Sequence, residues 1–313
     1  MRAAHNRDEL ASPGAFESIM STTSIPEIMS ILSRAGCPVI TDQLDILRCS
    51  QYGVNGGGQG DIYEGFLCDG DKVAIKTGRG DQSLDVAGGH ITFKRVAREV
   101  YTWFKVDHQN VAQLLGMAMF RGHIAMVSAW IEPGDFYKFI HRFPNANRMD
   151  LCVQVTQGLA YLHENRIVFE DLKAKNVLIN NQGIVKLTDF GLSTLEGSGI
   201  IFSITSTGNA VRGTTHWMAP ELFRGSMRCS FEADMYALAM TFVEMFTDDL
   251  PFPGLMEAVV ILKVVYEGEI PARPQRLIVG SVHHDWWWSF MQRCWSREPS
   301  VRPKAATSVH ERM

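Results

Sequence analysis

Apolar and polar residues alternate along this chain with two different periods. Short strand-like runs separated by polar turns such as CDGD occur before residue 131, at 61–67, 72–76 and 123–130. Beyond that point apolar residues recur at helical spacing, over 147–163, 231–247, 255–267 and 285–295. A hairpin, VLI-NNQG-IVKL, interrupts the helices. The pattern predicts a small strand-rich lobe, a linker near 129–135 and a larger helical lobe.

Two more helices are predicted in the first third of the chain. One covers 91–106, with an apolar face formed by Phe93, Val96, Ala97, Val100, Trp103 and Phe104. The other lies in a polar N-terminal arm, residues 1–43, which we expect to be partly flexible with a short helix near 25–35.

The arm helix has its own start and stop signals. Ser24 and Glu27 match a capping box, and Gly36 can end the helix. One face is apolar, formed by Ile28, Ile31 and Leu32. This face could dock on the following domain, which we favour, or bind a protein partner.

Composition narrows the functional classes. The 313 residues are 46% hydrophobic with a formal net charge of −4, which suits one or two globular domains and gives no electrostatic case for a nucleic-acid partner. No apolar run approaches the roughly 18 residues of a membrane helix, and the N-terminus lacks the core of a signal peptide. The six cysteines form no CxxC pair, which argues against a zinc site or a disulfide framework. We therefore expect a cytoplasmic protein without a membrane segment.

A glycine cluster, NGGGQG at 55–60, precedes the strand that contains Ile62. Glycines let backbone N–H groups approach phosphate oxygens without a Cβ clash. Asn55 stands where the G-x-G-x-x-G pattern has its first glycine, and asparagine tolerates positive φ better than most residues. Taken alone, the glycine cluster fits a plain flexible hairpin as well as it fits a phosphate-binding loop. A dinucleotide-binding fold is disfavoured, because that fingerprint opens a helix.

Charged residues at particular positions strengthen the phosphate interpretation. Lys76 ends the strand VAIK shortly after the glycines, where it could reach phosphates, and Glu99 on the helix 91–106 could hold it. Either residue taken alone would be an ordinary surface side chain.

A second group of polar residues surrounds the hairpin. Asp171, Lys173 and Asn176 lie in EDLKAKN before it, and Asp189 begins DFG after it. Asn176 and Asp189 offer the hard oxygen ligands that Mg²⁺ prefers. Asp171 can orient a hydroxyl and accept its proton, and Lys173 can neutralise charge on a moving phosphoryl group.

In that order, the motifs GGGQG, VAIK, RE, DLKAKN, DFG and APE resemble those of a eukaryotic protein kinase. The resemblance runs from about residue 44 to the end of the chain. The tyrosine-kinase-like group is resembled by two segments, GTTHWMAPE and RCWSREPSVRP. Other segments, such as VSAWIEPG, look like those of the expanded kinase sets of mushroom-forming fungi. Lys173, two residues after the catalytic Asp171, is the serine/threonine pattern of the family.

The resemblance implies an α+β, bilobal protein-kinase fold. A five-stranded antiparallel β lobe with one main helix would occupy 44–128, the hinge 129–135, and a mainly helical lobe 136–313. It also implies the transfer of the γ-phosphoryl group of ATP, with Mg²⁺, to a protein substrate.

Individual roles follow from the same resemblance. Lys76 and Glu99 would form an ion pair, Thr214 would contact Asp171 and Lys173, and Asp234 would brace the catalytic loop. Glu221 would pair with Arg302, and the hinge would follow a small residue, Ser128. The nucleotide would be held by Asn55, Gly57, Gly60, Ile62, Ala74, Lys76, Ala129 and Ile131.

Two residues depart from the family pattern. Phe169 replaces the usual His and Glu170 the usual Arg. Phe169 suits an apolar spine with Trp103, Leu114 and Phe190. Glu170 would oppose a docked phosphate, so we expect activity that does not depend on activation-loop phosphorylation. The alternatives to an active kinase are a pseudokinase that acts as a nucleotide-binding or scaffold module, and a small-molecule kinase, which APE and Arg302 disfavour.

Overall fold

The computed structural model describes residues 24–57, 60–78, 89–195, 215–224 and 229–310. This part of the chain divides into two compact units. The smaller unit contains the residues up to Asp107 together with Gln113–Trp130. The larger unit contains His108–Ala112 and the chain from Ile131 onward. The two units confirm the expected α+β, bilobal class.

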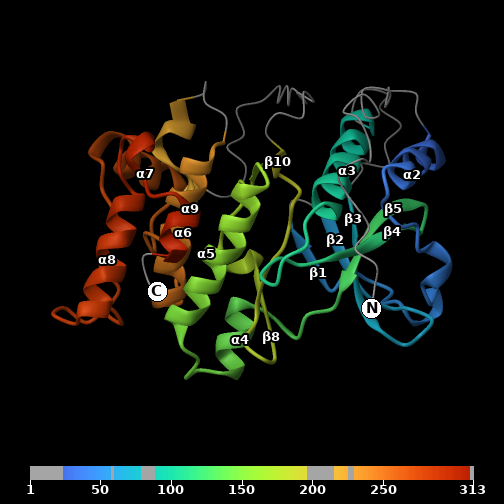
Figure 1. Cartoon of the computed structure of the whole chain (residues 1–313), viewed down its shortest axis with the longest axis horizontal. Coiled ribbons are helices and arrows are strands. Elements are labelled where there is room, and N and C mark those ends of the chain that lie inside the picture. The colour runs from blue at the N-terminus through green and yellow to red at the C-terminus, as the bar shows by residue number, and fades with distance from the viewer. Residues whose placement is uncertain (1–23, 58–59, 79–88, 196–214, 225–228, 311–313) are drawn as a thin grey trace. The chain divides into compact units, whose positions relative to one another are not determined.

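A five-stranded antiparallel sheet forms the centre of the smaller unit (Figure 1), as predicted. Its spatial order is β1-β2-β3-β5-β4. The strands are β1 (Asn55–Gly57), β2 (Gly60–Phe66), β3 (Lys72–Thr77), β4 (Leu114–Phe120) and β5 (His123–Ala129).

Strand register assigns the side chains to the two faces of this sheet. Ile62 pairs with Lys76 and Ala74 pairs with Ser128, so these four residues share one face. The other face is apolar and is covered by Ile40 and Leu44 from the N-terminal segment. The buried cluster on that side consists of Ile40, Leu44, Leu67, Val73, Ile75, Ala118, Phe120, Ala125 and Val127.

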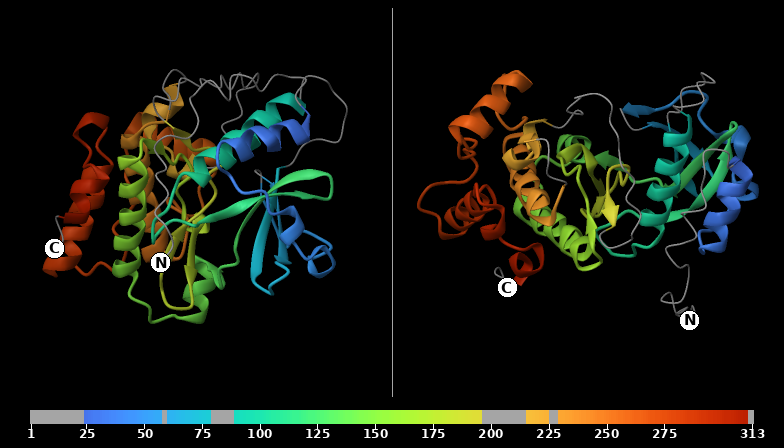
Figure 2. Two further views of the ribbon diagram at one scale, coloured as in Figure 1. Left: turned by 45° about the vertical axis from the view of Figure 1, so that its right-hand side comes forward. Right: turned by 90° about the horizontal axis from the view of Figure 1, so that it is seen from above.

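Helix α3 (Gly89–Phe104) and helix α2 (Ile25–Arg34) complete the smaller unit and lie side by side (Figures 1 and 2). The predicted helix near 25–35 is therefore present. Its first turn is held by the Glu27 carboxylate, which accepts hydrogen bonds from the backbone N–H and the hydroxyl of Ser24 at 2.8 and 2.9 Å. Both bonds lower the pKa of Glu27.

The chain after α2 continues along the open edge of the sheet. The Ile40 N–H donates to Met117 O at 2.9 Å, and the Met117 N–H donates to Pro38 O at 2.8 Å. Two 3₁₀ turns follow, at Thr41–Gln43 and Ile46–Arg48. We expected the β lobe to begin at about residue 44, but the first strand of the sheet begins at Asn55. The apolar residues of 40–49 cover the sheet instead of joining it.

The larger unit is mainly helical. Its α-helices are α4 (Phe136–Arg142), α5 (Arg148–Glu164), α6 (Phe231–Thr247), α7 (Glu257–Ile261), α8 (Val282–Cys294) and α9 (Ala305–His310). A π-helix, Leu262–Glu267, continues α7, so the helix predicted over 255–267 changes its hydrogen-bond pattern midway. Helix α4 was not predicted. In the described part of the chain, no helix is long and apolar enough to cross a membrane.

Short strands complete the larger unit. The predicted hairpin forms between β8 (Val177–Asn180) and β9 (Val185–Leu187), and β6 (Pro133–Asp135) pairs with β8. A separate pair joins β7 (Ile167–Val168) and β10 (Thr194–Leu195).

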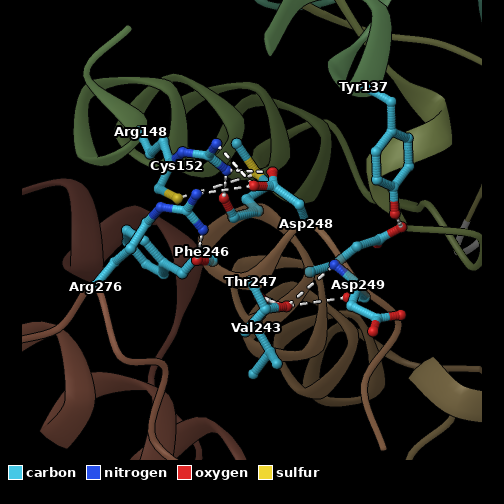
Figure 3. A network of polar contacts seen from close by, with 11 residues as sticks. Tyr137, Arg148, Cys152, Val243, Phe246, Thr247, Asp248, Asp249 and Arg276 are labelled. Atoms are coloured by element: carbon cyan, nitrogen blue, oxygen red, sulfur yellow. Dashed lines mark hydrogen bonds and ion pairs between the residues drawn. The ribbon is translucent and has the colours of Figure 1, made fainter. Parts of the chain in front are cut away.

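Two arginines hold the end of helix α6 (Figure 3). The Arg148 guanidinium donates to both carboxylate oxygens of Asp248 and to Met245 O. Arg276 donates to Phe246 O at 2.7 Å and pairs with Asp248 at 3.0 Å. These contacts satisfy carbonyl groups that a helix end leaves without intrahelical partners, which fixes the buried helix at its C-terminus.

Candidate active site

The smaller unit holds the predicted lysine–glutamate pair. Lys76 Nζ lies 2.5 Å from Glu99 Oε1, and the two residues are only 8% and 5% exposed. Strand β3 supplies the lysine and helix α3 the glutamate. Removing one partner of such a buried pair leaves an uncompensated charge. The pair therefore links the position of α3 to the sheet.

The predicted nucleotide residues lie around this lysine. Ile62 and Ala74 share its face of the sheet. At Gly60 an added Cβ would lie 2.3 Å from Thr77 O, so only glycine fits this close approach of two strands. Asn55 and Gly57 pair with Ile62 and Gly60 across β1 and β2.

The predicted hinge residues belong to different units. Ala129 is exposed at the end of β5 in the smaller unit, and Ile131 is half-buried at the start of the larger unit's second segment.

In the larger unit, Asp171 is the centre of a polar cluster. Its carboxylate is 1% exposed and accepts hydrogen bonds from Lys173 Nζ at 2.8 Å on each oxygen. Asn176 Nδ2 donates to the same carboxylate at 2.9 Å and to Asp171 O at 2.8 Å. These donors fix the carboxylate in a single orientation, as a proton acceptor requires.

Asn176 and Asp189 lie at the open end of the β8–β9 hairpin. Val177 pairs with Leu187, and the Thr188 N–H donates to Asn176 O at 3.1 Å, which brings the two predicted metal ligands close together. The amide nitrogen of Asn176 is turned toward Asp171, so its oxygen remains for another partner. Among the described residues, no group of three or more His, Cys, Asp and Glu could hold a metal alone.

The backbone before Asp171 is braced from helix α6, as predicted. The Asp234 carboxylate accepts hydrogen bonds from the Phe169 N–H at 2.8 Å and the Glu170 N–H at 2.9 Å. His163 Nε2 lies 2.9 Å from the same carboxylate. Glu170 has φ +70°, which is costly for a residue with a Cβ, so the brace stabilises a strained turn.

The two departures from the family pattern occupy different environments. Phe169 is fully buried, and its ring meets Phe190 edge-on with 5.5 Å between centroids. The other two expected spine members, Trp103 and Leu114, are buried in the smaller unit. The Glu170 carboxylate lies beside the Cys229 thiol, whose pKa is raised first by burial and then by this and other nearby carboxylates.

Two further predictions concern the activation segment. Glu221 and Arg302 form the predicted buried pair, with Nη1–Oε1 and Nη2–Oε2 distances of 2.6 and 2.8 Å. Thr214 lies outside the described residues. Ser193, which follows the DFG motif in this segment, is buried and donates to Phe169 O at 3.0 Å.

Glu244 is a buried carboxylate that the sequence analysis missed. It is 2% exposed on helix α6 and accepts hydrogen bonds from Ala174 N–H at 2.8 Å and Trp217 Nε1 at 3.0 Å. The Tyr137 hydroxyl of α4 donates to its other oxygen (Figure 3). The available signal was a single charged residue within the apolar run ALAMTFVEMF.

Comparison with known proteins gives relatives over most of the chain. The family described as "Protein kinase domain" matches residues 53–312. Serine/threonine-protein kinase STY17 of Arabidopsis thaliana is 28% identical over 258 residues, covering 81% of this chain and 42% of that protein. Mitogen-activated protein kinase kinase kinase 1a of Physcomitrium patens is 28% identical over 257 residues, covering 78% and 30%.

A further relative, serine/threonine-protein kinase STY46 of Arabidopsis thaliana, is 28% identical over 292 residues, which are 89% of this chain and 47% of that protein. The chain thus spans less than half the length of these curated relatives. The family match extends over both units. It contains the Lys76–Glu99 pair of the smaller unit and Asp171, Lys173, Asn176 and Asp189 of the larger unit. The chain belongs to the eukaryotic protein kinase domain family.

Proposed function

We propose that this protein is an active serine/threonine protein kinase that transfers the γ-phosphoryl group of ATP to hydroxyls of a protein substrate. The observation that carries the proposal is the buried Asp171 carboxylate, held by Lys173 and Asn176. The names of STY17 and STY46, which describe serine/threonine kinases, support the same activity.

Asp171 is the group that receives the proton of the attacking hydroxyl. Its carboxylate is fixed by donors on both oxygens, so it can orient a hydroxyl without reorganising. Lys173 is shared between Asp171 and the incoming phosphoryl group, because a lysine ammonium has three donors. A lysine two residues after the catalytic aspartate is the serine/threonine pattern of the family, which supports serine and threonine over tyrosine as the acceptor.

ATP bound with Mg²⁺ supplies the transferable phosphoryl group and a divalent charge that offsets the phosphate oxygens. The residues present fit these groups. Asn176 keeps its amide oxygen for a cation, and Asp189 adds a carboxylate oxygen. Lys76, kept in place by Glu99, would bind the phosphates, and Ile62 and Ala74 would contact the adenine from the same sheet face.

A pseudokinase remains the second candidate because Phe169 replaces the usual histidine. The structure favours activity on this point, since Phe169 is accommodated against Phe190 without disturbing Asp171 or the Asp234 brace. The substitution exchanges a hydrogen bond worth about 0.5–1.5 kcal/mol for apolar burial worth about 1.5–3 kcal/mol.

The test is transfer of radiolabelled phosphate from ATP to a generic protein substrate. Asp171→Asn should lower the rate by at least about 100-fold, because a positioned base contributes roughly 10²–10⁴. MgATP should still raise the melting temperature of this variant. Lys76→Met should impair transfer and weaken nucleotide binding to a smaller extent.

Each result has a distinct meaning. Wild-type transfer rates in Asp171→Asn would show that another group is the base. Nucleotide binding by the wild-type protein without any phosphate transfer would establish the pseudokinase instead. Phosphorylation of small molecules but of no protein would identify the protein as a small-molecule kinase.

A further inference from the structure

Helix α3, which carries Glu99, is buried on more than one side. In the second half of the helix, the buried residues are Val96, Ala97, Glu99, Val100, Thr102 and Trp103. At about 100° per residue these positions cover roughly 220° of the helix circumference. A helix that packs against a single sheet buries a stripe only about 100° wide. Elements other than the sheet therefore cover α3.

Helix α2 is one of those elements. It contacts α3 directly and also approaches β5 (Figures 1 and 2). Ile28 and Leu32, one turn apart on α2, are completely buried. Directly after the helix, a Cβ added at Gly36 would lie 3.4 Å from the Phe104 ring at the end of α3.

The position of α2 is fixed by the chain that follows it. Cys37 N–H donates to Leu32 O at 3.1 Å and Gly36 N–H to Ser33 O at 2.9 Å, with Gly36 at φ +96°. This is a Schellman ending. The next residues bond to the edge of β4 through Met117. At Gly116 an added Cβ would lie 2.6 Å from Pro38 O, so the strand edge and the segment are in tight contact.

We propose that α2 is an intramolecular clamp on α3, and that Ile28 and Leu32 are positioning residues for the Lys76–Glu99 pair. The pair joins a strand to a helix, so it persists only while α3 stays against the sheet. Ile28 and Leu32 touch no substrate; they act by restraining α3 and hence Glu99. Only the activity measurements in the test rest on the proposed kinase function.

The clamp has a regulatory consequence. The apolar face of α2 is already covered within its own unit, so a separate partner is not needed on this side of α3. Displacement of α2 would release α3 and weaken the Lys76–Glu99 pair. The N-terminal segment thus sets the fraction of molecules with Glu99 in place.

The experiment compares Leu32→Ala with Leu44→Ala in the full chain. Both remove a buried leucine from the smaller unit, but the apolar cluster around Leu44 includes no residue of α3. We expect Leu32→Ala to lower kcat/KM about tenfold and to speed hydrogen exchange of α3 amides. Leu44→Ala should lower the melting temperature similarly, with kcat/KM within about twofold of wild type. Ile28→Val provides a milder variant if Leu32→Ala does not fold.

A double-mutant cycle distinguishes positioning from general destabilisation. In a Glu99→Gln background, Leu32→Ala should cause little further loss of the residual kcat/KM, while the two losses in melting temperature add. A full tenfold loss in that background, or equal effects of Leu32→Ala and Leu44→Ala on α3 exchange, would overturn the clamp. If the wild-type protein transferred no phosphate, the kinase proposal alone would fail, and α3 exchange would still decide the clamp.

Discussion

At the scale of the residue, Glu244 connects three parts of the larger unit through one carboxylate. Its hydrogen-bond donors come from α4, from the catalytic loop beside Lys173, and from the 3₁₀ turn Thr215–Trp217. Burial alone would make a carboxylate here unfavourable, so the three donors are what makes the site stable. Glu244 is thus a support for the loop that carries Asp171.

Substitution of Glu244 should depend on whether the donors keep an acceptor. In Glu244→Gln, the amide oxygen can accept from Ala174 and Trp217 while its NH₂ group donates to Tyr137, so we expect a stability loss of only about 1 kcal/mol. Glu244→Leu leaves two buried donors, at Ala174 and Trp217, and the half-buried Tyr137 hydroxyl without their partner, at about 1–3 kcal/mol for each buried donor. Urea unfolding measures both losses. Equal losses would mean that the hydrogen bonds contribute little.

Comparison of the wild-type protein with Glu244→Gln also gives a prediction for the pH dependence of stability. Burial raises the pKa of Glu244 above its ordinary 4.5, and its hydrogen bonds oppose that shift. A carboxyl with a higher pKa when folded binds its proton more tightly in the folded state. Its ionisation therefore lowers stability as pH rises from the unfolded pKa through the folded pKa. The stability of wild type relative to Glu244→Gln should fall across that window and then level off; a flat difference would contradict it.

Sequence spacing predicted much of the site at this scale, because local motifs carry it. Asp171, Lys173 and Asn176 are close in sequence, and the hairpin brings Asp189 back to them. Glu244 could not be assigned, since its donors lie 27, 70 and 107 residues away. Only the fold brings those segments together.

At the scale of the element, helix α2 depends on how it ends. Gly36 adopts φ +96°, and a Cβ added there would lie 3.4 Å from the Phe104 ring, whereas Gly70 adopts φ +98° and a Cβ added there would meet nothing within 4 Å. The two glycines therefore separate backbone strain from packing. The strain for a residue with a Cβ is about 1–2 kcal/mol at either position.

Gly36→Ala and Gly70→Ala should therefore destabilise the protein by similar amounts, about 1–2 kcal/mol each, because both carry the backbone term and a methyl group at Gly36 makes only ordinary van der Waals contact with the Phe104 ring. Thermal unfolding of both variants gives the comparison. A clearly larger loss in Gly36→Ala would mean that the ending of α2 has no room for a methyl group beside α3.

Elements with strong periodicity were predicted well, and short ones were not. The signals for α4 were present, because Asp135 accepts a hydrogen bond from the Lys138 N–H and Phe136, Phe139 and Ile140 form one buried face. Seven residues are too few for periodicity to establish a helix. Pairing of residues 38–41 with β4 joins segments nearly 80 residues apart, which no local pattern encodes.

At the scale of the whole molecule, the predicted site is divided between two units of the chain. Lys76 and Glu99 belong to the smaller unit, and Asp171, Asn176 and Asp189 to the larger one. The order of motifs predicted both units, because each motif marks one element of the family fold. In the proposed function those motifs hold the ATP phosphates and the reacting hydroxyl, so they would not encode the identity of the protein substrate.

Magnesium should bind only together with nucleotide. Asn176 and Asp189 would supply only two protein ligands, and Mg²⁺ sheds its water reluctantly without phosphate oxygens. We expect MgCl₂ alone to leave the melting temperature nearly unchanged. MgATP at about 100 times its Kd should add about 2.7 kcal/mol of stability. Asp189→Asn should lose most of the magnesium-dependent part. Tight magnesium binding without ATP would contradict this arrangement.

The segment along β4 also determines which fragments of the chain can remain monomeric. The family match begins at residue 53, after the residues that cover the sheet edge and its apolar face. A fragment starting there would present unpaired backbone groups of β4 beside uncovered Val73, Ile75 and Val127. An open edge next to an apolar patch recruits strands from other molecules and leads to aggregation. The domain boundary that matters for solubility therefore lies before Pro38, not at residue 53.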